Sequence, residues 1–147
     1  MNKAARGAGD RALDLRIDSD PANLASARKA VEVFTAKWGF AEKDVNDVGL
    51  CLNEALANVM RHAYGGRTDR PIVISAAFDE RKKELTVRVR DWGNGIDPST
   101  IPHEPYNPLT PGGVGLICLS ELLDRMVYEP QPDGMLATMV KTRKDAG

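Results

Sequence analysis

The chain has 147 residues, and its 20 Lys or Arg residues nearly balance its 21 Asp or Glu residues, for a formal net charge of −1. This length fits a single domain with one hydrophobic core. A near-neutral charge without a basic stripe lacks the field on which nucleic-acid-binding proteins rely, so no direct nucleic-acid partner is expected. No uninterrupted apolar run approaches the ~20 residues of a membrane span, and the N-terminus has no apolar signal segment. We therefore expect a soluble, cytoplasmic protein with no membrane partner.

The two cysteines support the same location. Cys51 and Cys118 lie far apart, each within an apolar helical pattern. This placement predicts buried thiols rather than a disulfide or a metal pair. Buried thiols fit a reducing cytoplasm.

Strand and helix patterns follow one another along the chain without an internal repeat. In ALDLRID apolar residues alternate with polar ones, which predicts a strand, and Asp20 with Pro21 supplies an N-cap and a first-turn proline for a helix. Later pairs of short strands, each around a turn, favour antiparallel hairpins. The predicted order is strand 12–18, a helix from Asp20 to about Trp38, helix 42–63, strands 71–80 and 84–91, helix 115–126, and a closing hairpin over 126–143 with its turn at PQPDG.

This order of elements predicts an α+β fold, a two-layer sandwich of a mainly antiparallel sheet with helices on one face. Residues 1–10 are expected to be a flexible N-terminal arm, and residues 11–143 a single domain. The segment between the second hairpin strand and the third helix is crowded with Gly and Pro. A compact domain rarely keeps so long a loop unless it serves as a lid or binding segment. Residues 97–112 are therefore expected to form a lid that orders when ligand binds.

The second predicted helix carries polar residues at an unusual spacing. At 100° per residue, one arc of about 100° predicts a core stripe made of Val45, Val48, Leu52, Ala55, Leu56 and Val59. Glu54, Asn58 and Arg61 cluster on the opposite side, with His62 at the margin. A solvated face is the alternative, but Asn is a mediocre helix former on such a face.

The end of the second hairpin carries an acidic residue followed by glycines. Period-two counting along ELTVRVRD puts Asp91 on the same inward face as Val87 and Val89. A carboxylate at the rim of a core requires a donor. Gly93 and Gly95 permit a sharp turn or the close approach of a ligand. The alternative is an ordinary Asp-x-Gly turn.

A third constellation is TPGGVGLICLSELLDR, in which glycines run directly into a predicted helix start. Free backbone N–H groups and the positive end of the helix dipole suit such a junction to phosphate. No Gly-Lys-Ser/Thr follows these glycines and no strand of a βαβ unit precedes them, which excludes the Walker and dinucleotide patterns. The alternative is a plain loop-to-helix junction.

In this order, the three constellations resemble the Bergerat-type ATP-binding fold of the histidine-kinase-like ATPase superfamily, which histidine kinases, type II topoisomerases, heat-shock chaperones and mismatch-repair ATPases share. The short length and the boxes E-A-x-x-N-x-x-x-H-x-Y and G-x-G-L-x-x-x-x-x-L-x-D look most like the anti-sigma-factor serine/threonine-protein kinases of bacterial partner-switching systems. The resemblance covers roughly residues 10–143.

The resemblance implies a role for each matching residue. Asn58 is similar to the Asn that holds Mg²⁺ on the nucleotide phosphates, and Glu54 to the acidic residue that orients or deprotonates the attacking hydroxyl. Asp91 looks like the carboxylate that reads adenine. The other cofactor-binding positions implied are His62, Gly93, Gly95, Thr110, Gly113, Val114, Gly115, Leu116 and Thr138.

Thr138 and Val114 differ from the other implied positions in residue type or setting. Thr138 shares one face of its predicted strand with Leu136 and Val140, and a hydroxyl among core residues is expected in the wall of the adenine pocket beside Asp91. Val114 stands where many relatives have Arg, which removes a charge-assisted contact near the phosphates. The transfer rate is expected to suffer more than nucleotide binding.

The resemblance thus implies an anti-sigma factor that binds ATP and Mg²⁺ and acts as a protein serine kinase. It implies a serine on a small antagonist protein as the acceptor, a sigma factor as the sequestered target, and a homodimer. One alternative is an ATP-sensing regulatory binding module without kinase activity. Another is a detached histidine-kinase catalytic domain, which the lack of a preceding helix pair with a phospho-acceptor His disfavours.

Overall fold

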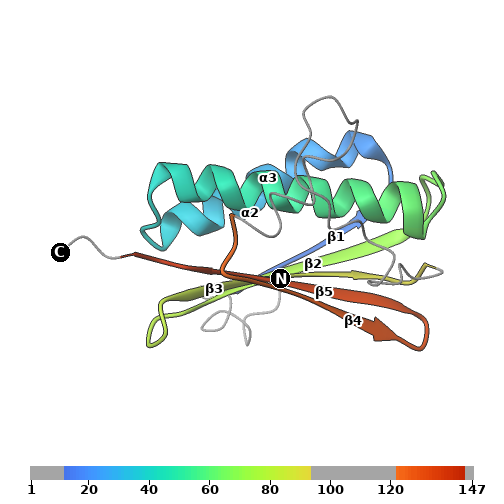
Figure 1. Cartoon of the computed structure of the whole chain (residues 1–147). Helices are drawn as coiled ribbons and strands as arrows, with labels where there is room; N and C mark the ends of the chain where they lie inside the picture. The colour runs from blue at the N-terminus through green and yellow to red at the C-terminus, as the bar shows by residue number, and fades with distance from the viewer. Residues whose placement is uncertain (1–11, 94–121, 145–147) are drawn as a thin grey trace, which may run out of the picture.

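In the computed structural model, residues 12–93 and 122–144 are described. Their regular elements are β1 (Ala12–Asp18), the 3₁₀ turn η2 (Pro21–Asn23), α2 (Leu24–Lys37), α3 (Glu42–Asn58), the π-helical turn η3 (Val59–Ala63), β2 (Pro71–Asp79), β3 (Glu84–Asp91), β4 (Arg125–Gln131) and β5 (Gly134–Thr142). The strands form one antiparallel sheet in the order β1-β2-β3-β5-β4. Figure 1 shows α2 and α3 side by side on one face of that sheet. The predicted two-layer α+β sandwich is confirmed.

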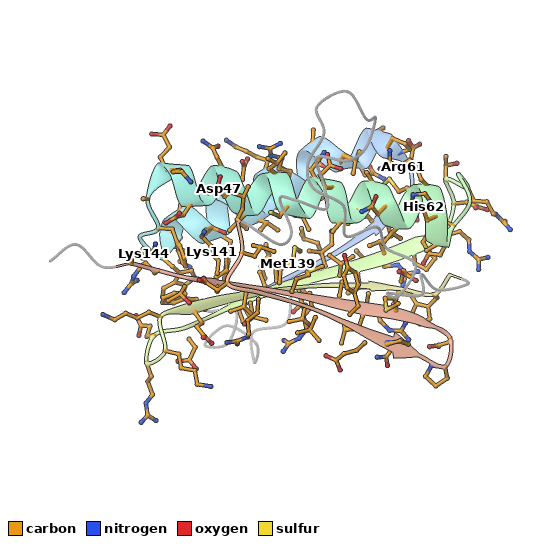
Figure 2. All side chains as sticks on the ribbon, in the orientation of Figure 1. Asp47, Arg61, His62, Met139, Lys141 and Lys144 are labelled. Atoms are coloured by element: carbon orange, nitrogen blue, oxygen red, sulfur yellow. The ribbon has the colours of Figure 1, made fainter. Side chains whose placement is uncertain are left out.

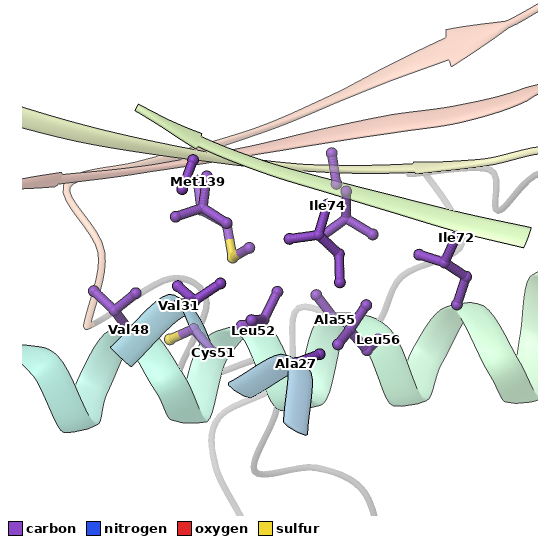
Figure 3. Close-up of a cluster of buried hydrophobic side chains, with 14 of the residues drawn as sticks. Ala27, Val31, Val48, Cys51, Leu52, Ala55, Leu56, Ile72, Ile74 and Met139 are labelled. Atoms are coloured by element: carbon purple, nitrogen blue, oxygen red, sulfur yellow. The ribbon is translucent and has the colours of Figure 1, made fainter. Parts of the chain in front are cut away.

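The core lies between the helices and the sheet. Period-two alternation buries every second residue of β2 and β3, because only one face of the sheet meets the helices. Val31 and Leu52 from the helices point toward Ile74 and Met139 of the sheet (Figure 3). Cys51 is also buried in this layer, as predicted, whereas Cys118 lies outside the described residues.

The first helix begins as its sequence predicts. The Asp20 carboxylate accepts a hydrogen bond from the Ala22 amide at 2.9 Å, and Pro21 occupies the first turn. That turn is 3₁₀, so the α-helix proper starts at Leu24, four residues after the cap. Gly39 follows the helix with a φ of +83°, a conformation that favours glycine.

The closing hairpin is tighter than predicted. Pro130 and Gln131 belong to β4, where they pair with Met135 and Gly134. The connection is therefore only the two residues 132 and 133, rather than the whole of PQPDG. A proline is tolerated inside β4 because this is an edge strand, with one side free of ladder hydrogen bonds.

The predicted third helix, 115–126, is wrong at its C-terminal end. Residues 122–124 are bends, and β4 has already begun at Arg125. The rest of that helix, the N-terminal arm and the predicted lid at 97–112 lie outside the described residues. No helix in the described ranges is long and apolar enough to span a membrane.

Candidate functional site

Glu54 and Asn58 lie one turn apart on the last part of α3. Both side chains are half-buried, whereas the neighbouring Ala55 and Leu56 are buried in the core. The Asn58 Oδ1 atom accepts a hydrogen bond from Nη2 of the exposed Arg61 at 3.1 Å. The polar side of the helix that the sequence predicts is therefore present. The side-chain oxygen of Asn58 already accepts a hydrogen bond from a guanidinium group.

The helix changes its winding directly after Asn58. Residues Val59–Ala63 form a π-helical turn, which the Tyr64 amide closes by donating to the Val59 carbonyl at 2.9 Å. The sequence prediction of one regular helix through Ala63 missed this turn. Because a π turn adds one residue per turn, counting at 100° per residue fails beyond Asn58. His62 is exposed, and Figure 2 shows it with Arg61 in η3, the turn that continues α3.

Asp91 is a buried carboxylate at the end of β3. Its exposed fraction is 1%, and it faces the helix layer with Val87 and Val89, as period-two counting predicted. The Gly93 amide donates to Oδ1 at 3.0 Å. Burial raises the pKa of Asp91, and the backbone amide of Gly93, the charge of Arg90 and the amide of Met135 oppose that rise. Among the described residues no side chain donates to this carboxylate, so it keeps acceptor capacity for a ligand.

The strand end that carries Asp91 is packed against the end of the π turn. A Cβ added at Gly93 would lie 2.8 Å from the carbonyl carbon of Ala63 and would overlap its oxygen. Tyr64 reinforces this contact, because its hydroxyl accepts from the Trp92 amide at 2.8 Å and donates to the Pro71 carbonyl at 2.5 Å. The helix with Glu54 and Asn58 and the strand with Asp91 are thus joined directly.

Arg90 holds the other side of the same strand end. Its guanidinium lies 4.6 Å from the centre of the Trp92 ring and donates to Asp133 at 2.5 Å and to the Asp91 carbonyl. Sequence reasoning missed this contact, since 43 residues separate Arg90 from Asp133. From the sequence, Tyr64 stands out only as the last residue of the box E-A-x-x-N-x-x-x-H-x-Y.

Thr138 does not lie beside Asp91. In the ladder between β3 and β5, Thr138 pairs with Arg88, whereas Met135 pairs with Asp91. Successive residues of a strand point to opposite faces, so Thr138 faces away from the helix layer. Its hydroxyl is buried and has no partner among the described residues. The prediction that Thr138 forms the pocket wall beside Asp91 is therefore wrong.

The structure brings Asp91 and Gly93 next to the turn that follows Asn58. The remaining predicted cofactor-binding residues lie outside the described ranges: Gly95, Thr110, Gly113, Val114, Gly115 and Leu116. Within those ranges no cluster of three or more His, Cys, Asp or Glu side chains is placed to hold a metal. Mg²⁺ commonly takes one or two protein ligands, with substrate phosphates and waters completing an octahedron. A single amide oxygen at Asn58 fits that pattern.

This geometry agrees with comparisons to known proteins. Residues 17–141 match the family described as the histidine kinase-like ATPase domain. The match spans most of the chain, and the chain belongs to this family.

Within this family, the chain is similar to proteins named as serine-protein kinases and anti-sigma factors. The chain is similar to the serine-protein kinase RsbW of Listeria monocytogenes, with 27% identity over 88% of this chain and 85% of the relative. It is also similar to the anti-sigma F factor of Clostridium beijerinckii, with 26% identity over 91% of this chain and 95% of the relative. The crystal structure of the RsbU and RsbW domains of Rv1364c from Mycobacterium tuberculosis shares the fold, with a TM-score of 0.67 and 18% identity over 90% of this chain and 32% of that chain.

Proposed function

We propose that this chain is an ATP-dependent protein serine kinase that also acts as an anti-sigma factor. One observation carries the proposal: the buried Asp91, with unused acceptor capacity, lies on a strand end that is packed against the helix bearing Glu54 and Asn58. The relatives named serine-protein kinase and anti-sigma F factor match over most of the chain and support the same reading.

Asp91 is the proposed adenine reader. A buried carboxylate that lacks a side-chain donor gains a charge-assisted hydrogen bond when the exocyclic amine of adenine approaches. Gly93, whose amide donates to Oδ1 of Asp91, would lie next to the base. The phosphates would then extend toward Asn58, and the resemblance makes Gly113 and Gly115 the further proposed phosphate contacts.

The proposed chemistry is phosphoryl transfer to a serine hydroxyl. Mg²⁺, held through the Asn58 oxygen, would neutralise phosphate charge. Glu54 would accept the proton of the serine hydroxyl while the serine oxygen forms a bond to the γ-phosphorus. The bond between that phosphorus and the β,γ-bridging oxygen breaks, and ADP leaves with both electrons of the broken bond.

The partners belong to the same proposal. The acceptor is a small antagonist protein, the sequestered target is a sigma factor, and the kinase acts as a cytoplasmic homodimer. Sedimentation of the purified chain with and without ATP tests the dimer.

The test separates binding from chemistry through variants on one helix. Glu54→Gln should keep Mg·ATP affinity within a few-fold yet lower phosphoryl transfer by about 10²–10⁴, the usual effect of losing a positioned acid or base. Asn58→Ala should damage both, because the metal neutralises charge in the ground state and the transition state. Glu42→Gln, at the exposed far end of α3, is the matched control and should change neither.

The assay is transfer of labelled γ-phosphate to a protein in a lysate of the source cell, with phosphoserine identified by mass spectrometry. Tight ATP binding without any labelled protein would overturn the kinase assignment and favour an ATP-sensing binding module. Transfer by Glu54→Gln at the wild-type rate would remove Glu54 from the chemistry.

A further inference from the structure

The hydroxyl of Tyr64 lies where the ends of three elements meet: the end of η3, the start of β2 and the end of β3. Tyr64 follows the π turn, Pro71 opens β2, and Trp92 is the first residue beyond β3. The side chain is 5% exposed, and its hydroxyl joins the other two segments, accepting from the Trp92 amide and donating to the Pro71 carbonyl. Burial raises the pKa of Tyr64, so the phenol keeps its proton at neutral pH and remains a donor.

The bond to Trp92 acts on Asp91 because the two residues share a peptide unit. The N–H of that unit donates to Tyr64, and its carbonyl, which belongs to Asp91, accepts from Arg90. Both polar groups of one rigid peptide plane are therefore held by side chains. The ladder pairs Asp91 itself with Ile72 and Met135, and Tyr64 with Arg90 holds the peptide unit that follows it. That unit sets the position of the next amide, Gly93, whose hydrogen bond to Oδ1 fixes the rotation of the Asp91 carboxylate.

We propose that Tyr64 is a positioning residue that aims the Asp91 carboxylate and thereby sets selectivity for 6-aminopurines over 6-oxopurines. The inference rests on the proposed adenine reading by Asp91. A hydrogen bond from the 6-amino group depends on alignment, because such bonds weaken steeply as the angle departs from linear. A carboxylate free to turn loses this bond, whereas binding of a base without the amine changes little.

The test compares ADP with inosine diphosphate, which carries an oxygen in place of the 6-amino group, by calorimetry in Mg²⁺. Tyr64→Phe keeps the buried ring and its contact with Arg70, whose guanidinium lies 5.8 Å from the ring centre, and removes only the hydroxyl. Tyr128→Phe removes a hydroxyl from the partly buried ring on β4 and is the matched control.

The wild type and Tyr128→Phe should prefer ADP by at least tenfold. Tyr64→Phe should lower that ratio at least threefold, with affinity for inosine diphosphate unchanged within twofold. A merely structural role would lower the melting temperature without altering the ratio. A wild-type ratio in Tyr64→Phe would overturn the inference.

Failure of the underlying proposal has a different signature. If the wild type does not discriminate and Asp91→Asn changes nothing, adenine reading by Asp91 fails. If Asp91→Asn abolishes a preference that Tyr64→Phe retains, only the role of Tyr64 fails. Should Tyr64→Phe not fold, Arg90→Gln releases the carbonyl of the same peptide unit and should lower the ratio likewise; an unchanged ratio there would also overturn the inference.

Discussion

Replacement of Gly93 by Ala tests whether close packing of the strand end on the helix end sustains the site. The new Cβ would overlap the Ala63 carbonyl oxygen and lie 2.8 Å from its carbon and 2.9 Å from the Ala63 Cβ, so one segment must retreat by more than the ~0.6 Å that would return the carbon alone to an ordinary contact. Both obstacles belong to helix-end backbone or a rigid methyl group. Overpacking of this kind costs about 1–3 kcal/mol, and the lower chain entropy of the unfolded Ala variant returns about 0.4–1 kcal/mol.

Because the Cβ overlaps a backbone oxygen, the overpacking cost lies in the upper half of its range, and the expected net loss in Gly93→Ala is about 1–2.6 kcal/mol. For a domain of this size that corresponds to a Tm lower by roughly 2–10 °C. ADP affinity should fall as well, since the displaced Gly93 amide donates to Asp91. Differential scanning calorimetry measures the first effect and titration calorimetry the second.

Gly49→Ala supplies a control with the same chemical change and the opposite expectation. Its Cβ would also lie 2.8 Å from other atoms, but these are Cγ and Cδ of the flexible Glu32 side chain. Ala is favoured over Gly in a helix interior by about 0.8–1 kcal/mol. The displaced Arg28–Glu32 ion pair, an i,i+4 pair on the neighbouring helix α2, is worth only about 0.3–0.5 kcal/mol. Gly49→Ala should keep or slightly raise Tm and leave ADP affinity unchanged; equal losses in the two variants would refute the reasoning.

Two further predictions concern charge. Burial raises the folded-state pKa of Asp91 above its unfolded value, so its ionised form costs stability at neutral pH. The stability of the wild type relative to Asp91→Asn should rise as pH falls through the raised pKa, which melting curves between pH 4 and 7 check; a constant difference would contradict it. Arg61→Gln should lower the Mg²⁺ concentration for half-maximal ATP binding by about two- to fivefold, because the guanidinium now occupies Asn58 Oδ1. A greater need for Mg²⁺ would instead indicate that Arg61 binds phosphate.

The sequence predicts the features that depend on local periodicity. The inward position of Asp91 follows from period two along β3, and the cap at Asp20 follows from residue type and spacing. Both need only a few neighbouring residues.

Other features depend on contacts or windings that local patterns do not encode. The π turn after Asn58 departs from the helical period on which the count rests. The prediction put Thr138 on the wrong face of the sheet. Which residues of β5 face the helices depends on its register with β3, in which Met135 lies opposite Asp91. The hydrogen bond from Trp92 to Tyr64 joins residues 28 positions apart. Only the folded chain reveals these relations.

The tight hairpin between β4 and β5 has a consequence for how this protein can vary. Hairpin tips on a surface ordinarily accept insertions. Here a Cβ at Gly134 would overlap the Asp91 carbonyl oxygen, and the neighbouring Asp133 binds Arg90. A longer tip would move both residues and shift the peptide unit that orients Asp91. The length of this turn is thus constrained by its contacts with the strand end that carries Asp91. Insertions or deletions in the turn should therefore change the preference for adenine nucleotides.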